Sequence, residues 1–187
     1  MMKITLCGDG GVGKTSLRKR YVGQGFDTDY ITTIGADFVS KQITLYNGSE
    51  SKELKFHIWD LAGQPTFSRV RKLYFQYTLG AFLVYDITRP DTLFSLEMWM
   101  NELSKNSGST DISVIVLGNK SDLQEENMDR VKSEKARKYI SEELIARFDN
   151  INQEITFFET SAKTGKNVNE AFQELGLKIY NKYRTDW

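Results

Sequence analysis

The chain has 187 residues, 40% of them hydrophobic and 27% charged, which is the composition of a folded globular protein and not of a disordered one. The 25 basic and 25 acidic side chains cancel, so global electrostatics give no support to binding of nucleic acid or of a membrane surface. Cys7 is the only cysteine and His57 the only histidine, which excludes an internal disulfide and argues against a zinc site. We expect a single domain over residues 1–187 in a reducing, cytoplasmic compartment.

The first third of the chain alternates between strand and helix patterns. Residues 4–6 begin a short strand that runs into a glycine-rich segment, and residues 14–23 are predicted to be helical. Residues 38–46 and 52–60 alternate like two strands, and Asn47-Gly48 between them is a strong signal for a hairpin turn.

The middle of the chain contains two segments typical of interior strands. Residues 80–87 and 112–119 are dense in β-branched and aromatic residues, as strands covered on both faces are. Between them, residues 91–104 predict a helix with one apolar stripe, formed by Leu93, Leu96, Trp99, Met100 and Leu103. This alternation predicts an α/β fold with a mostly parallel sheet, and ligands are expected at the carboxyl ends of its strands.

Residues 8–15 read G-D-G-G-V-G-K-T and fit the pattern G-x-x-x-x-G-K-[ST] in full, between a predicted strand and a predicted helix. The glycines let successive backbone N–H groups converge on phosphate oxygens, and the helix that follows adds the positive end of its dipole. Lys14 is placed to reach the β- and γ-phosphates, and the Thr15 hydroxyl is placed to bind Mg²⁺. The predicted phosphate site consists of Gly8, Asp9, Gly10, Gly11, Val12, Gly13, Lys14, Thr15 and Ser16.

The segment V-L-G-N-K-S-D-L leaves the second buried strand with Asn119, Lys120 and Asp122. A carboxylate there can accept hydrogen bonds from the ring N–H and the exocyclic amino group of guanine. Adenine has an acceptor at the matching ring nitrogen and lacks the amino group, and sites built on such pairing can reject the wrong partner by roughly 10⁴. In isolation N-K-S-D would indicate a polar turn, but after a phosphate loop it predicts recognition of guanine.

Six motifs, in order, give the chain its resemblance to the small GTPases of the Ras superfamily, and to the Rab branch most closely. They are G-D-G-G-V-G-K-T, Y-I-T-T-I-G-A-D-F, W-D-L-A-G-Q, L-V-Y-D-I-T, N-K-S-D-L and F-F-E-T-S-A-K-T-G-K-N-V. The resemblance covers nearly all of the chain. It implies a P-loop G domain, in which a mostly parallel six-stranded sheet has one antiparallel edge strand and helices on both faces. It also implies a switch that binds and hydrolyses GTP, with a role in vesicle trafficking or related signalling.

The resemblance also implies roles for residues near the γ-phosphate. Thr33 matches the threonine that binds Mg²⁺ and the γ-phosphate, and Asp60 matches the acid that holds the Mg²⁺ shell. Gly63 matches the glycine that contacts the γ-phosphate, and Gln64 matches the glutamine that orients the attacking water. The implied catalytic set is Gln64, Lys14 and Thr33, and the implied metal set is Thr15, Thr33 and Asp60.

Further nucleotide contacts follow from the resemblance. Phe26 matches an aromatic residue that packs against guanine, although it could equally belong to the core. The N–H of Ala162 would donate to the guanine oxygen, a group that adenine lacks. The remaining implied contacts are Tyr30, Leu123, Ser161 and Lys163.

Partner proteins are a further implication. Phe38, Trp59 and Tyr74 match positions where relatives expose aromatic residues to effectors, and the alternative for all three is interior packing. The motifs contain no arginine that could act as an arginine finger in cis. We therefore expect slow intrinsic hydrolysis, stimulated by a GTPase-activating protein, and nucleotide release through an exchange factor. The competing hypotheses are a guanine-nucleotide scaffold with little turnover and an ATP-using kinase, and Asp122 argues against the kinase.

The chain departs from the Rab pattern in several places. It has Y-F-Q-Y-T where Y-Y-R-G-A is usual, and residues 131–148 predict additional helix. Its last residues, N-K-Y-R-T-D-W, carry no prenylation signal, so the chain shows no lipid anchor: either the tail was trimmed or the protein has none of its own. Peripheral membrane association would need a lipidated tail or a partner outside this chain.

Pro65 follows the predicted water-orienting Gln64. We expect it to be the first residue of a short helix, where its missing N–H has no partner to lose. A proline also disfavours the α conformation of the residue before it, so Gln64 is predicted to be extended. In the helix that follows, Phe67, Val70 and Tyr74 have helical spacing, and Arg69, Arg71 and Lys72 are expected to lie mostly on other faces.

Overall fold

A computed structural model of the chain describes residues 1–26, 32–47, 50–108, 111–123, 130–148 and 155–183. Its six strands form one sheet in the order β2-β3-β1-β4-β5-β6. All neighbouring strands are parallel except β2 and β3, so β2 is an antiparallel edge strand. The strands are β1 (Met2–Cys7), β2 (Ala36–Asn47), β3 (Glu50–Leu61), β4 (Gly80–Asp86), β5 (Ser113–Asn119) and β6 (Thr156–Glu159). The predicted fold class is confirmed.

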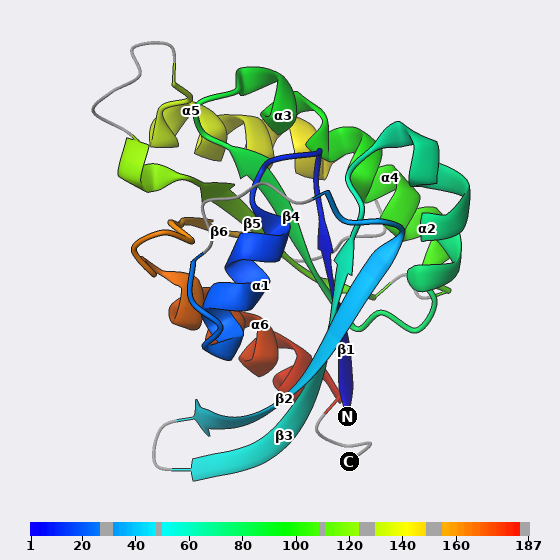
Figure 1. Cartoon of the computed structure of the whole chain (residues 1–187), viewed down its shortest axis with the longest axis vertical. Helices are drawn as coiled ribbons and strands as arrows, with labels where there is room; N and C mark the ends of the chain where they lie inside the picture. The colour runs from blue at the N-terminus through cyan, green and yellow to red at the C-terminus, as the bar shows by residue number, and fades with distance from the viewer. Residues whose placement is uncertain (27–31, 48–49, 109–110, 124–129, 149–154, 184–187) are drawn as a thin grey trace.

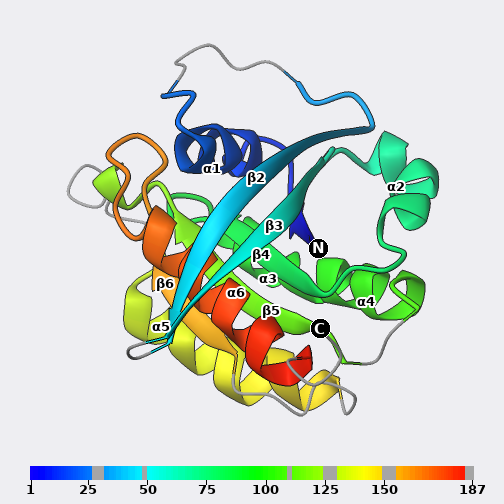
Figure 2. The ribbon, with the colours of Figure 1, turned by 90° about the horizontal axis from the view of Figure 1, so that it is seen from below.

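Helices cover both faces of the sheet (Figures 1 and 2). One face carries α1 (Lys14–Val22) and α6 (Val168–Tyr183), and the other carries α2 (Ser68–Tyr74), α3 (Pro90–Phe94), α4 (Leu96–Asn106) and α5 (Ser133–Lys138). The strands serve both cores because successive side chains point to opposite faces. In β4, Phe82 and Val84 pack with the α1 and α6 core, whereas Ala81, Leu83 and Tyr85 pack with the other.

Helix α6 lies directly on the edge of the sheet through Gly176. A Cβ atom at this position would lie 2.6 Å from Leu45 of β2 and 2.9 Å from Phe56 of β3, both of which are buried. Gly80 makes the same kind of contact from the sheet side, because its Cβ would lie 2.6 Å from Ile179 of α6. These glycines set the spacing between the last helix and the strands.

The predicted helix over residues 91–104 is present but divided. Helix α3 ends at Phe94 and α4 begins at Leu96, with Ser95 between them in the helical region. The five residues of its predicted apolar stripe are all buried, as expected. The predicted hairpin is confirmed by the pairing of Asn47 with Glu50, while residues 48–49 lie outside the described part of the chain.

The predicted helix over residues 131–148 is confirmed in outline. It consists of α5, a π-helical segment, Tyr139–Leu144, and a 3-10 turn, Ile145–Arg147. The ring of Tyr139 meets that of Phe94 edge-on, with 5.2 Å between the ring centroids. The additional helical residues therefore pack against α3.

The predictions for Pro65 and Gln64 are confirmed. Pro65 begins a 3-10 turn, Pro65–Phe67, and Gln64 before it is extended, with φ −78° and ψ 142°. Val70 and Arg71 lie on different faces of α2, as expected, but Val70 is 42% exposed whereas Arg71 is 1% exposed. Arg71 takes the interior position because its guanidinium group finds buried partners, described below.

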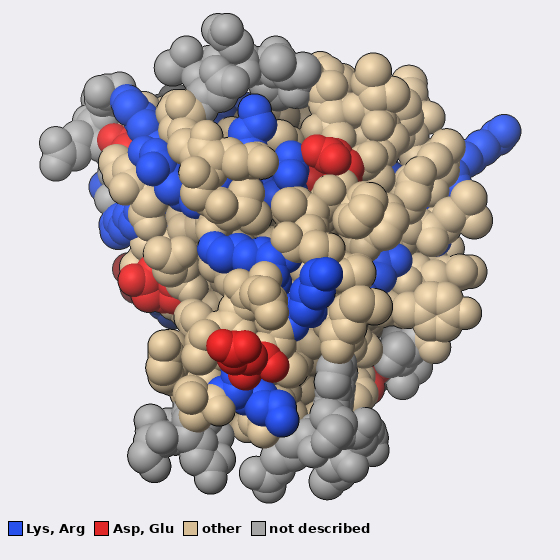
Figure 3. Space-filling view, turned by 60° about the horizontal axis from the view of Figure 1, so that its bottom comes forward, with Lys and Arg blue, Asp and Glu red and all other residues tan. Residues whose placement is uncertain are grey.

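The surface carries charges of both signs. Figure 3 shows Lys and Arg side chains spread over one face, with acidic side chains among them and uncharged surface between. In the described part of the chain, none of the helices combines the length and apolar character needed to cross a membrane.

Candidate nucleotide site

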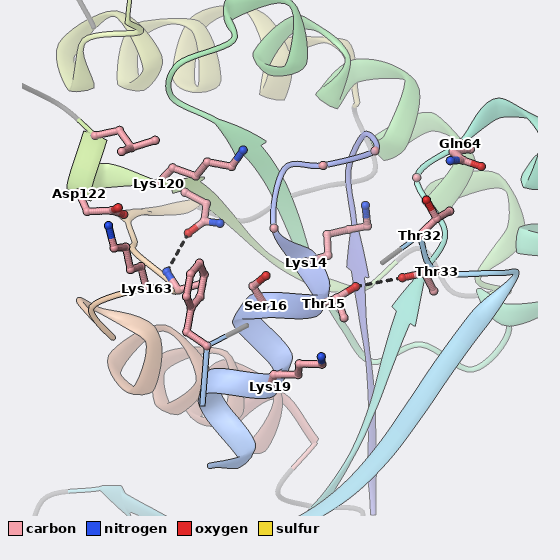
Figure 4. A pocket seen from close by; sticks show the side chains of 18 residues that line it. Lys14, Thr15, Ser16, Lys19, Thr32, Thr33, Gln64, Lys120, Asp122 and Lys163 are labelled. Carbon is pink, nitrogen blue, oxygen red and sulfur yellow. Dashed lines mark hydrogen bonds between the residues drawn. The ribbon is translucent and has the colours of Figure 1, made fainter. Parts of the chain in front are cut away.

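A pocket of about 430 Å³ lies at the carboxyl ends of the strands. Lys14, Thr15 and Ser16 enter it from the start of α1, Lys120 and Asp122 follow β5, and Lys163 comes from the loop before α6 (Figure 4). The predicted site residues that line it are Gly10, Gly11, Gly13, Lys14, Thr15, Ser16, Phe26, Thr33, Gly63, Gln64, Asn119, Lys120, Asp122, Leu123, Ala162 and Lys163.

Six predicted site residues are not among those that line the pocket. Tyr30 lies outside the described residues, and Gly8, Asp9, Val12, Asp60 and Ser161 are absent from the lining. Lys19 and Thr32 line it and were not predicted. Lys19 lies one turn after Thr15 on α1, so helical spacing from the phosphate motif could have indicated it.

The phosphate loop needs its glycines for close packing as well as for conformation. At Gly8, φ is +147° and a Cβ would lie 2.1 Å from the carbonyl oxygen of Val84. At Gly13, φ is +98° and a Cβ would lie 2.2 Å from the side-chain nitrogen of Asn119. Any side chain at these two positions would push the loop away from β4 or from the end of β5.

Lys14 folds back onto its own loop. Its Nζ donates hydrogen bonds to the carbonyl oxygens of Gly8, at 2.6 Å, and Asp9, at 2.8 Å. Burial lowers the pKa of Lys14 to about 8, although the nearby Asp60 acts in the opposite direction. A buried ammonium group beside a pocket lined with glycine backbone is suited to an anionic ligand.

Two hydroxyl groups that line the pocket, those of Thr15 and Thr33, lie close to the buried carboxylate of Asp60. The hydroxyl of Thr15 lies 3.0 Å from that of Thr33 and donates to Oδ2 of Asp60 at 2.5 Å (Figure 4 shows the two threonines). Asp60 is fully buried, and its Oδ1 has no hydrogen-bond partner among the described residues. Burial raises its pKa, opposed by Thr15, Lys14 and Arg18. Hydroxyl and carboxylate oxygens with an unused acceptor fit a hard divalent cation such as Mg²⁺.

Asn119 ties together the loops on the other side of the pocket. Its Nδ2 donates to the carbonyl oxygen of Val12 at 2.8 Å, and its Oδ1 accepts from the backbone N–H of Ala162 at 3.2 Å. Next to it, Oδ1 of Asp122 accepts from the hydroxyl of Ser161 at 2.5 Å. Three segments far apart in the sequence are thereby fixed around one cavity, and Phe26, 40% exposed, lies at its edge rather than in the core.

Asp86 and Arg89 form a support behind these loops that the sequence did not indicate. Burial alone would raise the pKa of Asp86, but hydrogen bonds from Lys120 and Thr88 hold it below its usual value. Nζ of Lys120 lies 2.6 Å from Asp86, and Nη2 of Arg89 donates to the carbonyl oxygen of Gly10 at 2.9 Å. Asp86 belongs to the motif L-V-Y-D-I-T, for which the resemblance implies no particular contact.

Arg71 supports the loop that carries Gln64. Its Nη1 donates to the carbonyl oxygens of Gln64, at 2.8 Å, and Ala62, at 3.0 Å. Its Nε and Nη2 donate to the two carboxylate oxygens of Glu102 on α4, at 3.1 and 2.9 Å. A bidentate pair of this kind fixes direction as well as charge.

The aromatic residues predicted to contact effectors form one stack across the surface of the hairpin. The ring centroid of Trp59 lies 5.1 Å from that of Phe38 and 5.4 Å from that of Tyr74. Phe38 is 54% exposed, whereas Trp59 and Tyr74 are half-buried against the α2 and α4 core. Interior packing therefore holds for Trp59 and Tyr74, Phe38 is accessible from outside, and contact with effectors stays a prediction.

A sheet of this topology with a phosphate loop after its first strand defines a P-loop nucleotide-binding protein. A model of the Ras family matches residues 3–181, and the chain belongs to this family of small GTPases. Members of the family hydrolyse GTP to GDP and phosphate, generally with Mg²⁺, so the chain is a GTPase.

The curated relatives agree with the Rab-like assignment. GTP-binding protein YPT52 of Saccharomyces cerevisiae is 35% identical over 201 residues, which covers 96% of this chain and 82% of that protein. GTP-binding protein ypt4 of Schizosaccharomyces pombe is 38% identical over 172 residues, covering 92% and 68%. Ras-related protein Rab-13 of Rattus norvegicus is 36% identical over 182 residues, covering 97% and 81%.

Proposed function

We propose that the chain is a GTP-hydrolysing switch of the Rab type, acting in membrane trafficking through partners that bind its GTP form. The observation that carries this proposal is that the phosphate loop, the segment Asn119–Asp122 and the loop containing Ala162 all line the same pocket. In this proposal each of the three segments binds one part of the nucleotide.

The base is recognised by Asp122 and Ala162. The carboxylate accepts from the two N–H groups on the guanine edge, and the N–H of Ala162 donates to the guanine oxygen. Ser161 already donates to Asp122, which holds the carboxylate in place before the base arrives. Phe26, at the edge of the pocket, packs against the base.

The phosphates are bound by the backbone of the phosphate loop and by Lys14. A phosphate oxygen takes the place of the carbonyl groups that Lys14 now contacts, and its negative charge restores the affinity of Lys14 for its proton. Thr15, Thr33 and Asp60 would hold Mg²⁺, which would supply positive charge that offsets the charge of the phosphates. Gly63 lies against the same loop, where a Cβ would be 2.5 Å from the backbone nitrogen of Gly10.

Hydrolysis requires a water oriented by Gln64, whose side chain lines the pocket. Arg71 and Arg89 are both engaged with backbone carbonyls and carboxylates, so neither is free to act as an arginine finger. The intrinsic rate is therefore expected to be slow, with an activating protein supplying positive charge. Loss of the γ-phosphate removes the contacts of Thr33 and Gly63, which changes the surface that partners recognise.

The test exchanges the hydrogen-bonding pattern of the base site. Asp122→Asn replaces one carboxylate oxygen with a donor, so the affinity for GDP should fall by more than about 100-fold, while the affinity for xanthosine diphosphate should rise. Titration calorimetry with both nucleotides measures the two affinities. Asp91→Asn, an exposed acid at the start of α3, is the matched control and should bind GDP as the unaltered chain does. An Asp122→Asn variant that binds GDP with unchanged affinity would contradict the proposed base site.

The alternative is a scaffold that binds guanine nucleotide with little turnover, and it is favoured by one observation. Pro65 holds Gln64 in an extended conformation and so restricts its approach to a water. Release of phosphate with and without a stimulating cell extract distinguishes the two. No stimulated release would favour the scaffold.

A further inference from the structure

Arg18 is a buried arginine to which none of the nucleotide motifs assigns a role. It lies on α1, one turn after Thr15, and its side chain is 6% exposed. Its Nη2 donates to Oδ2 of Asp37 at 2.8 Å. Its Nε is buried without a hydrogen-bond partner among the described residues and lies 4.0 Å from Oδ2 of Asp60.

The two carboxylates near Arg18 come from directly opposite positions on neighbouring strands. Asp37 of β2 is the register partner of Asp60 of β3 in an antiparallel pair. Directly opposite residues of such a pair point to the same face, and like charges in these positions destabilise the sheet. The guanidinium group of Arg18 reaches this face from α1 and offsets the repulsion, because it contacts one carboxylate and lies close to the other.

Both Arg18 and Asp60 keep a buried polar atom unused. Nε of Arg18 and Oδ1 of Asp60 have no partner among the described residues, and the carboxylate side chain is fully buried. Removing one member of a buried charge pair leaves the other uncompensated, which is costly. Arg18 therefore supplies, from inside the protein, part of the positive charge that Asp60 otherwise obtains from a metal ion.

We propose that Arg18 is a positioning residue that sets how strongly nucleotide binding depends on a divalent cation. The inference rests on the proposed function, since Asp60 is the carboxylate assigned there to the Mg²⁺ shell. Arg18 weakens the affinity for Mg²⁺ because it offsets part of the negative charge of Asp60. For the same reason it slows the loss of nucleotide when the cation is removed. Asp37 limits this effect because it draws the guanidinium group toward β2.

The test uses the unaltered chain and its variants loaded with methylanthraniloyl-GDP, a fluorescent GDP analogue. Arg18→Met should lower the apparent dissociation constant for Mg²⁺ by about tenfold, the scale expected when a unit charge a few ångströms away is removed. The same variant should lose the analogue faster in excess EDTA. Arg18→Gln should shift both quantities in the same directions, and Arg18→Lys, which keeps the charge, should change them least.

Substitution of Asp37 should change the dissociation constant for Mg²⁺ in the opposite direction. Asp37→Asn leaves the guanidinium group free to pair with Asp60, so the apparent dissociation constant for Mg²⁺ should rise. The change should be smaller than for Arg18→Met, since Asp37 is 59% exposed. General damage to the fold would move both variants in the same direction. Lys55→Met, an exposed position on β3, is the control for loss of a basic residue and should change neither quantity.

Thermal unfolding of each variant shows which ones are folded. If neither Arg18→Met nor Arg18→Gln folds, the Asp37→Asn variant provides the test. A raised dissociation constant for Mg²⁺ in that variant supports the inference, and an unchanged or lowered one overturns it. Folded neutral variants with unaltered Mg²⁺ affinity and EDTA-induced release also overturn it. Failure of the unaltered chain to bind the analogue would instead overturn the proposed function, so the two failures are distinguishable.

Discussion

Arg71 stacks on Trp99, with 4.2 Å between its guanidinium carbon and the centroid of the indole ring. The indole Nε1 donates to Oδ1 of Asp9 at 2.8 Å, and Arg71 donates to the carbonyl oxygen of Gln64. A buried path thus leads from the phosphate loop, through α4, to the loop that carries Gln64. A substitution that moves Asp9 or the backbone of Gln64 would therefore disturb the contacts between them.

Arg71→Met should lower the free energy of unfolding by about 2–4 kcal/mol, because Glu102 and two backbone carbonyls lose their donor inside the protein. Urea unfolding at a fixed GDP concentration measures this, since bound nucleotide itself adds stability. The double variant Arg71→Met with Glu102→Met should recover part of the loss. Equal stability of the Arg71→Met variant and the unaltered chain would show that the network contributes little.

Pro65→Ala should lower the free energy of unfolding by about 0.5–1 kcal/mol, because the unfolded chain gains conformational freedom. It should also let Gln64 leave the extended region, so the intrinsic hydrolysis rate should rise by a factor of about two to three as the side chain approaches the water more freely. Single-turnover phosphate release measures the rate. An unchanged rate together with the stability loss would make the role of Pro65 structural only.

Cys7 should react with a thiol reagent only through unfolding. It is fully buried, and burial raises the pKa of its thiol from 9.0 to about 12. Between pH 9 and pH 12 the thiol of the unfolded state has lost its proton, whereas the thiol of the folded state has kept it. The contribution of Cys7 to stability is therefore present below pH 9 and falls as the pH rises toward 12. Comparison with Cys7→Ala isolates this contribution, because other groups titrate in the same range. Rapid labelling of the native protein at pH 8 would contradict the prediction.

Trp59→Ala should weaken binding of a GTP-dependent partner while leaving nucleotide affinity intact. The ring stacks with the exposed Phe38, and Nζ of Lys3 lies over it at 4.8 Å from the ring centroid. Trp59 does not line the pocket. Proteins retained by the GTP-analogue form and not by the GDP form provide the measurement. Tyr46→Ala, an exposed aromatic residue on the same hairpin, is the control. Parallel loss of partner and nucleotide binding would indicate that Trp59 serves mainly in packing.

The sequence predicted those parts of the protein whose chemistry is local. The phosphate loop needs glycines and a lysine at fixed spacing, and a proline constrains the residue before it, so Lys14 and the extended Gln64 could be predicted from neighbouring residues alone. The strands β4 and β5 were equally clear, since both of their faces are buried.

Arg71 and Arg18 could not be predicted in this way. Each is charged and lies in a helix, so helical spacing alone suggests a solvated side chain. Their burial depends on Glu102 and Asp37, residues that the fold brings close from elsewhere in the sequence. The same reason explains why the support of the phosphate loop by Arg89 was missed.

The hydrogen bonds of Asn119 to Val12 and Ala162 have a consequence for the synthesis of the protein. The phosphate loop leaves the ribosome long before the segment containing Ala162 exists, so the nascent chain carries the phosphate loop without the segment that completes the pocket. If guanine binds as proposed, nucleotide capture reports that β6 has been made and has joined the sheet. A cell that supplies abundant guanine nucleotide would pull newly made chains into the folded state only at this last stage of their production.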